Sequence, residues 1–177
     1  MLSQLLIGCG SRRHRAVALD GNTNFENVTT LDINSDHNPD IIHDLCDLPL
    51  PFPDESFDEI HAYEVLEHTG RQGDAEFFFD QFSDFWRMLK PNGTLHASVP
   101  WWQGVWAWGD PSHTRTIQPE TLSFLHQPKY TAEIGVTAMS DFRYLYQADF
   151  DMIHGHRDDV TFSFILRAIK PSRSTKP

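Results

Sequence analysis

The feature that most constrains the fold is a short apolar run that ends abruptly in two glycines. The apolar residues 5–7 lead directly into Gly8-Cys9-Gly10, close to the start of a chain of 177 residues. An apolar run bounded by glycine predicts a buried strand. Glycine at both positions permits positive φ and lets a ligand lie against the main chain. The run therefore predicts a first strand that delivers a ligand-binding loop.

An acidic residue at the end of the next predicted strand indicates which kind of ligand this loop binds. The strand-like run 28–33 contains Asp32, which follows Gly10 by 22 residues. A carboxylate at about this distance commonly lies at the neighbouring strand tip and accepts hydrogen bonds from a ribose diol. The glycine pair and Asp32 together predict a nucleoside-binding site.

Composition places the chain among globular domains. It is 40% hydrophobic and 22% charged, with a formal net charge of −11, which disfavours a nucleic-acid partner. The basic cluster at 12–15 fits a solvated segment as well as an anion site. Cys9 and Cys46 form neither a disulfide framework nor a metal spacing, which fits a reducing cytoplasm. We expect one cytoplasmic domain over 1–170, a flexible tail over 171–177 and no membrane partner, because no run is long enough to span a bilayer.

The order of the predicted elements indicates an α/β fold. Strands are expected at 41–45, 57–63 and 94–99, alternating with connections, which is typical of a mostly parallel sheet. A helix is expected over 74–90 and a short one over 12–19. The runs 142–153 and 160–169 are joined by a short polar connection, which predicts an antiparallel pair. The long helix is expected to bury an aromatic stripe and to turn its charges outward: Phe78, Phe82, Phe85, Trp86 and Leu89 inside, Asp80, Asp84 and Arg87 outside.

Taken together, five stretches resemble the class I S-adenosylmethionine-dependent methyltransferases. They are Gly8-Cys9-Gly10, Asp32, 48–57, 64–68 and 89–93. The resemblance extends from residue 5 to about residue 125. It is to the subset with a Gly-Cys-Gly loop and no helical extension before the first strand, so the cofactor site is expected to be open or roofed by another subunit. It implies a Rossmann-like, mostly parallel twisted sheet of about seven strands with an antiparallel C-terminal hairpin strand and helices on both faces.

The resemblance also implies S-adenosyl-L-methionine as cofactor and a role for each matching residue. The glycines would face the methionine moiety and Asp32 the ribose. Asp44 and Leu45 would face the adenine, although Asp44 also fits a solvated loop acid, and Tyr63 and Glu64 would border the sulfonium. The implied cofactor-binding set is Gly8, Cys9, Gly10, Asp32, Ile33, Asp44, Leu45, Tyr63 and Glu64.

Two positions depart from the family pattern. Leu6 stands where an acid usually precedes the first glycine, and Arg12 stands where many members have a third glycine. We therefore expect Arg12 or His14 to meet the methionine carboxylate.

Methyl transfer needs alignment of the reacting atoms, and a base only if the acceptor must lose a proton. His113 lies in a loop after the fifth predicted strand, where this architecture places acceptor-binding segments. We predict that His113 contacts the acceptor or acts as base, with His68 as a second catalytic candidate. His68 also fits a cation at a helix C-terminus. No metal site is expected, and His154 and His156 are interpreted as exposed hairpin histidines.

Four of the five tryptophans crowd into the segment 101–108. Large rings in a glycine-flanked loop suggest a lid or a stacking surface for a flat or sugar-like acceptor. A hydrophobic plug or a contact between subunits of a homo-oligomer fits equally well.

Two classes of function follow from these features. The first is methyl transfer to a small-molecule or carbohydrate-like acceptor. The second is a non-catalytic methyltransferase-like module that binds a partner through the segment 101–108. A nicotinamide dehydrogenase is disfavoured because Arg13 interrupts the Gly-x-Gly-x-x-Gly pattern. Cofactor binding measured by calorimetry separates the first two.

Overall fold

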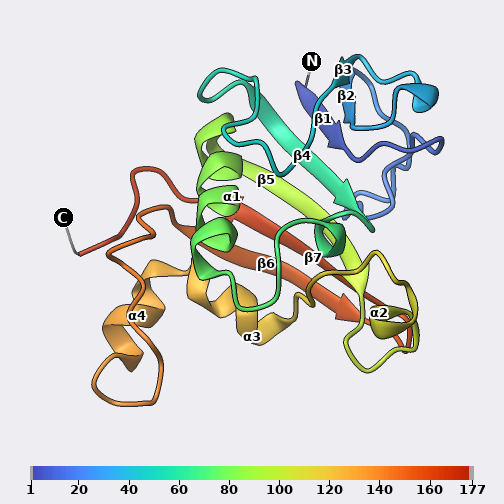
Figure 1. Ribbon diagram of the computed structural model, residues 1–177. Helices are drawn as coiled ribbons and strands as arrows, with labels where there is room; N and C mark the ends of the chain where they lie inside the picture. Colours follow the sequence, from blue (N-terminus) through green and yellow to red (C-terminus); the bar gives the residue numbers. More distant parts are fainter. Residues whose placement is uncertain (1, 176–177) are drawn as a thin grey trace.

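The computed structural model describes residues 2–175 (Figure 1). Seven strands form one sheet in the order β3-β2-β1-β4-β5-β7-β6. The first five in this order are parallel, and β7 runs antiparallel to both of its neighbours. The predicted fold class is therefore confirmed. The strands are β1 (Gln4–Ile7), β2 (Val28–Asp32), β3 (Ile41–Ile42), β4 (Phe57–Tyr63), β5 (Leu89–Pro100), β6 (Phe150–Arg157) and β7 (Thr161–Ala168).

The helices are few, and most are short. The α-helices are α1 (Ala75–Met88), α2 (Trp106–Gly109), α3 (Pro119–Leu122) and α4 (Gln127–Glu133). Three 3-10 turns are η1 (Ser35–His37), η2 (Leu66–His68) and η3 (Ser123–Leu125). No helix in residues 2–175 combines the length and the apolar character that a membrane crossing requires.

Helix α1 forms where the sequence predicted it. The Asp74 side chain accepts a hydrogen bond from the Phe77 amide and so caps the first turn. One expectation was wrong, because Asp84 is buried instead of facing solvent. Its carboxylate accepts a hydrogen bond from the Leu50 amide at 2.8 Å and pairs with Arg87 Nε at 2.7 Å. These contacts compensate the cost of burying the charge.

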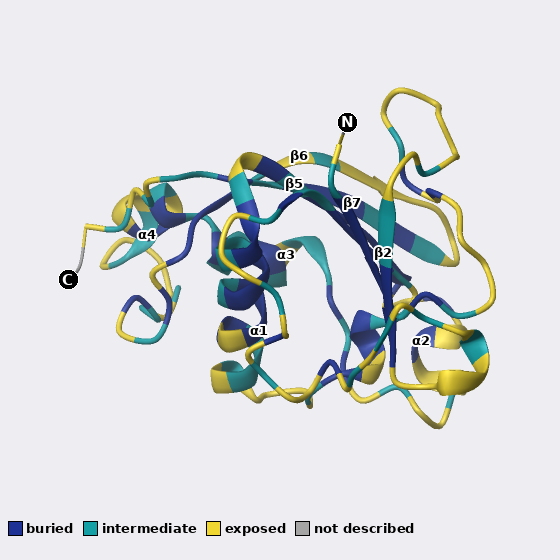
Figure 2. Cartoon of the chain, turned by 90° about the horizontal axis from the view of Figure 1, so that it is seen from above, coloured by how far each residue is buried: buried dark blue, intermediate teal, exposed yellow. Residues whose placement is uncertain are grey.

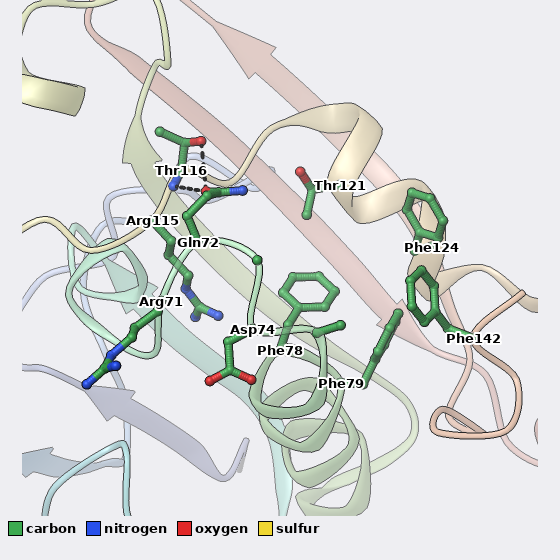
Figure 3. A pocket seen from close by; sticks show the side chains of 12 residues that line it. Arg71, Gln72, Asp74, Phe78, Phe79, Arg115, Thr116, Thr121, Phe124 and Phe142 are labelled. Carbon is green, nitrogen blue, oxygen red and sulfur yellow. Dashed lines mark hydrogen bonds between the residues drawn. The ribbon is translucent and has the colours of Figure 1, made fainter. Parts of the chain in front are cut away.

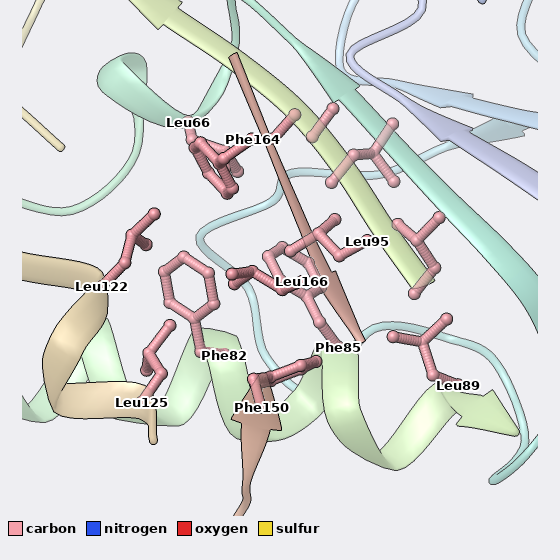
Figure 4. Packing of buried hydrophobic residues seen from close by; sticks show 14 of the residues in the cluster. Leu66, Phe82, Phe85, Leu89, Leu95, Leu122, Leu125, Phe150, Phe164 and Leu166 are labelled. Atoms are coloured by element: carbon pink, nitrogen blue, oxygen red, sulfur yellow. The ribbon is translucent and has the colours of Figure 1, made fainter. Parts of the chain in front are cut away.

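The apolar core lies between α1, α3 and one face of the sheet (Figures 2 and 4). Side chains alternate between the two faces of a strand, so Leu95, Ala97 and Val99 of β5 face this core. Phe82 and Phe85 of α1 are fully buried in the same cluster. This face follows from the apolar periodicity of the sequence.

The opposite face of the sheet is polar. His61 and His96 lie side by side on it, with ring centroids 4.8 Å apart. Helices were expected on both faces, but here the irregular segment 11–27 provides the cover. The Val17 carbonyl accepts a hydrogen bond from His96 Nδ1 at 2.9 Å, and the Phe25 ring contacts the His61 ring edge-on.

The short helix predicted over 12–19 was wrong. Within this segment Arg15 forms bonds to more distant residues in place of a helical turn. Its amide donates to the Thr23 carbonyl, and its guanidinium contacts Asp20 and Glu59. These tertiary contacts outweigh the weak helical periodicity, as they often do in short segments.

The bounds of the last strands also differ from the predicted ones. The run 142–153 becomes β6 only from Phe150 onward, and residues 142–149 are turn and extended chain. The segment expected as a flexible tail contains Arg173, whose Nε lies 2.6 Å from a carboxylate oxygen of the buried Asp149. Residues 176–177 lie outside the described part of the chain.

Candidate functional site

A cleft opens where the carboxyl ends of β1 and β4 meet. At β1 the chain order of the strands reverses, since β2 lies on one side of it and β4 on the other. In open parallel sheets, ligands bind at such a switch point. The cleft has a volume of about 820 Å³, which suits a nucleoside-sized ligand. Of the predicted cofactor residues it brings together Gly8, Cys9, Gly10, Tyr63 and Glu64.

The two glycines are required for different reasons. Both have positive φ, +59° at Gly8 and +50° at Gly10. A Cβ at Gly8 would lie only 2.3 Å from Val65 Cγ2, so this glycine permits close packing of the η2 turn. A Cβ at Gly10 would meet nothing within 4 Å. Both glycines line the cleft, but only at Gly10 is the space beside the Cα empty.

Asp32 is joined to the glycine turn directly. Its Oδ2 accepts a hydrogen bond from the Gly10 amide at 2.9 Å, and its Oδ1 accepts one from the Asn34 amide at 2.8 Å. Burial opposes ionisation, but these amides and the neighbouring His37 hold the pKa of Asp32 below its usual value. An ionised carboxylate oxygen can accept more than one hydrogen bond. Among residues 2–175, Oδ1 receives only the Asn34 amide, whereas Oδ2 faces both the Gly10 amide and His37 Nδ1 at 3.2 Å. The group is thus fixed, charged and able to accept further hydrogen bonds.

Asp32 is only 7% exposed and, like the remaining residues predicted to hold the nucleoside, is not among the residues that line the cleft. Ile33 is exposed, with 65% of its surface accessible, and Leu45 is buried. Asp44 is exposed, and its Oδ1 accepts a hydrogen bond from the Cys46 amide. Asp44 and Leu45 follow β3, which pairs with the end of β2. The pairing of these two strands therefore brings both residues to the same edge of the sheet as Asp32. Their contacts with the adenine stay a prediction.

The cleft contains residues that sequence reasoning placed correctly and others that it missed. Arg12 and His14, expected to meet a carboxylate, both line it. Asp158, Thr161 and Ser163 of the β6–β7 hairpin line it as well. No local motif marked these three residues, because only the pairing of β7 with β5 brings the hairpin to this edge of the sheet.

Tyr63 and Glu64 lie at the end of β4, and both have raised pKa values. The Tyr63 hydroxyl lies 2.7 Å from His61 Nδ1, and burial raises the pKa of Tyr63 to about 12. Glu64 adopts a φ of +49°, which is strained for a residue with a side chain. Desolvation raises the pKa of Glu64, and the nearby His113 and His68 partly offset this increase. Burial thus opposes ionisation of both side chains at the wall of the cleft.

The two predicted catalytic histidines meet each other. The rings of His68 and His113 are in edge-to-face contact, with centroids 4.7 Å apart. Glu67 lies between them, and its Oε1 is 3.9 Å from His68 Nε2 and 4.0 Å from His113 Nε2. Desolvation raises the pKa of the buried Glu67 to about 8. Neither histidine lines the cleft beside Gly8 and Gly10, here called the glycine cleft. The position of Glu67 between the two histidines was not predicted.

Hydrogen bonds hold the His113 loop against η2. The Thr114 amide donates to the Glu67 carbonyl at 2.9 Å. The buried Arg115 donates from Nε to the Leu66 carbonyl at 2.9 Å and from Nη2 to Thr69 Oγ1 at 2.8 Å. These bonds join segments almost 50 residues apart, and they fix His113 beside Glu67.

The tryptophan segment lies beside the hairpin and not in the cleft lining. Trp101 is buried, with the Arg157 guanidinium stacked 4.8 Å from its ring. Trp106 and Trp108 of α2 are 60% and 70% exposed. The plug alternative thus fits Trp101 only, since the other rings face solvent.

A second cavity lies at the start of α1, on the helix-covered side of the sheet (Figure 3). Its volume is about 260 Å³, and Phe78, Phe79, Phe124 and Phe142 form much of its wall. Gln72 Oε1 accepts a hydrogen bond from the Thr116 amide at its edge. None of the predicted site residues lines this cavity.

Solved structures with the same fold include proteins described as methyltransferases. A SAM-dependent methyltransferase from Archaeoglobus fulgidus is 17% identical with a TM-score of 0.56, covering 94% of this chain and 86% of its own. One from Methanosarcina mazei is 16% identical with a TM-score of 0.55, covering 95% and 92%. The cyclase SpnF is 15% identical with a TM-score of 0.57, covering 95% and 74%. These likenesses show the fold, which hosts more than one chemistry.

The sequence comparisons identify the family. No curated protein matches the chain. The family model described as a methyltransferase domain matches residues 5–97, which is more than half of the chain. The open backbone at Gly10 and the ionised Asp32 fit S-adenosylmethionine, which the family match and the fold support as cofactor. The chain belongs to the methyltransferase domain family.

Proposed function

We propose that this protein is an S-adenosylmethionine-dependent methyltransferase acting on a small-molecule or carbohydrate-like acceptor. The observation that carries the proposal is the hydrogen bond from the Gly10 amide to Asp32 at 2.9 Å, at the switch point of the sheet. It joins the two elements from which the nucleoside site was predicted. The family match over residues 5–97 supports the same conclusion.

When bound, the cofactor supplies an electrophilic methyl group on a positively charged sulfur. The chain's own contribution is binding and alignment. The Asp32 carboxylate accepts hydrogen bonds from the ribose hydroxyls, and the Gly10 backbone leaves room for the methionine moiety. Arg12, which is exposed on the cleft wall, attracts the methionine carboxylate.

We place the acceptor on the side of the cleft where β4 and β5 end. Glu64 lines the cleft, and His68 and His113 are near enough to its carboxyl group to lower its pKa. An acceptor that enters between Glu64 and these histidines can approach the cofactor's methyl group. His113 is then the acceptor-contacting residue of the proposal, with His68 next to it.

Titration calorimetry with S-adenosylhomocysteine tests the cofactor assignment. We expect binding with one site, weakened at least about tenfold in Asp32→Asn because the neutral amide loses charge-assisted bonds to the ribose. Asp36→Asn is the matched control, since Asp36 is an exposed acid in the neighbouring η1 turn. Failure of the wild-type protein to bind would contradict the proposal.

A second candidate function rests on the exposed tryptophans. Trp106 and Trp108 lie near Val105, which is 78% exposed, and exposed apolar groups of this kind favour contact with a partner. The alternative is a non-catalytic module that binds a partner, or a second copy of the chain, through the segment 101–108. Absent cofactor binding together with self-association lost in Trp106→Ala would favour it.

The location of the protein is likewise a proposal. Cys9 and Cys46 are both free thiols, and Cys46 is exposed. Free exposed thiols suit a reducing compartment, so we propose the cytoplasm.

A further inference from the structure

The Glu67, His68 and His113 side chains present three metal-ligating atoms to one point. The relevant oxygen and nitrogen atoms all lie within 4.8 Å of one another. Ligands in a tetrahedral zinc site are about 3.4 Å apart, because each bond is about 2.1 Å long. The distances of 3.9 and 4.0 Å from Glu67 Oε1 to the two histidines therefore need to shorten by only about half an ångström.

One oxygen of the buried Glu67 carboxyl group has no hydrogen-bond partner in the described part of the chain. The residue is 2% exposed, and its Oε2 has no hydrogen-bond partner among residues 2–175. The buried Arg115 attracts this group electrostatically, but its hydrogen bonds go to Leu66, Thr69 and Gln81. An ionised carboxylate is costly at a buried position, and a bound cation would compensate that cost.

Ser112 orients the His68 ring for coordination. Its hydroxyl lies 2.5 Å from Asp110 Oδ1 and 3.0 Å from His68 Nδ1. An ionised carboxylate only accepts hydrogen bonds, so the hydroxyl proton points to Asp110. The hydroxyl oxygen then accepts from His68 Nδ1–H, which leaves His68 Nε2 with a free lone pair. A hydrogen bond to the other ring nitrogen orients metal-binding histidines in this way.

We infer that Glu67, His68 and His113 bind a divalent transition-metal ion with the ligand preferences of zinc. Two imidazoles and one carboxylate form a known zinc ligand set with a further position open. Asp110 borders that position, since its Oδ2 lies 3.9 Å from His113 Nε2. The His68 side chain is 35% exposed and gives the ion access from solvent. This inference stands whether or not the chain transfers methyl groups.

Metal titration of the full chain tests the site without an activity assay. The protein is first freed of metal with a chelator, and ZnCl₂ binding is then measured by calorimetry. CoCl₂ is titrated in parallel, because four-coordinate Co²⁺ gives intense visible absorption bands. The variants are Glu67→Gln, His68→Ala and Ser112→Ala. His154→Ala on β6 is the matched histidine control, and Cys46→Ser removes the exposed thiol.

We expect one zinc ion per chain in the wild-type protein and in both controls. Glu67→Gln and His68→Ala should weaken binding by at least about a hundredfold. Ser112→Ala should weaken it by about ten- to a hundredfold, the usual effect of removing a hydrogen bond that orients a metal ligand. Zinc should also raise the thermal unfolding midpoint of wild type but not that of His68→Ala. Because His68 is exposed, this variant is expected to fold even if Glu67→Gln does not. Absence of one-site binding, or unchanged affinity in His68→Ala, would overturn the inference.

Discussion

On one face of the sheet, α1 buries Phe82 and Phe85 against β5, whereas on the other face the irregular segment 11–27 lies over His61 and His96. The first face is stabilised by apolar packing, which requires regular elements with matched periodicity. The second is held by individual hydrogen bonds and ring contacts. The segment over the polar face also contributes the wall of the glycine cleft. The helix-covered face thus supplies stability, and the polar face supports the site.

The largest effect is expected on the helix-covered face. Phe82→Ala removes a ring that is completely buried, so the free energy of unfolding should fall by about 3–5 kcal/mol. Urea denaturation followed by circular dichroism measures it. Asp80→Ala, an exposed change on the same helix, should stay within about 0.5 kcal/mol. A loss below about 1 kcal/mol in Phe82→Ala would remove the contrast between the faces.

The polar face should make stability depend on pH. Burial lowers the pKa of His96 to about 4, against 6.5 for an ordinary histidine, and the residues around it are His61, Glu59 and Arg15. Between these values the unfolded chain binds a proton that the folded chain does not. The contribution of His96 to the free energy of unfolding therefore rises with pH across this window, by up to about 3 kcal/mol, whereas Glu67, whose pKa is raised to about 8, contributes in the opposite direction.

Denaturation at pH 4.5 and pH 7 measures this dependence. His96→Gln should reduce the difference between the two conditions, whereas His154→Gln on β6 should not. Glu59 does not interfere, because its hydrogen bond with His61 lowers its pKa to about 2. The stabilisation that Glu59 contributes to the folded state is lost only as the pH falls below about 4.5. An equal pH dependence in His96→Gln and wild type would refute the explanation.

The smallest effect is expected in the covering segment itself. Phe25 is half-buried, with its ring centroid 4.9 Å from that of His61. Phe25→Ala should cost about 1 kcal/mol, the typical value for an aromatic pair. Leu19→Ala serves as the control, since Leu19 is 62% exposed and should change stability by less than about 0.5 kcal/mol. A Phe25 effect as large as that of Phe82 would mean that the two faces are equally packed.

Sequence reasoning succeeded where a few neighbouring residues determine the structure. The glycine turn, Asp32, α1 and the sheet class each follow from a local pattern, and the structure has them as predicted apart from small shifts in bounds. The short helix over 12–19 was mispredicted because contacts of Arg15 with distant residues decide the conformation of this segment. Propensity alone carries no information about such contacts.

The candidate site was only partly predictable for the same reason. His68 and His113 were both singled out, but their meeting at Glu67 depends on the bonds of Thr114 and Arg115 to η2. Thr161 reaches the cleft only through the antiparallel pairing of β7 with β5. Both results require knowledge of which distant segments pack together.

The uneven burial of the tryptophans gives this protein a built-in optical reporter. Trp106 and Trp108 face solvent, while Trp101 is covered, so intrinsic emission contains a water-quenched, red-shifted component from α2. Anything that settles on this helix should shift the emission to the blue and shield it from acrylamide quenching. An unlabelled sample can therefore be screened for molecules that dock there.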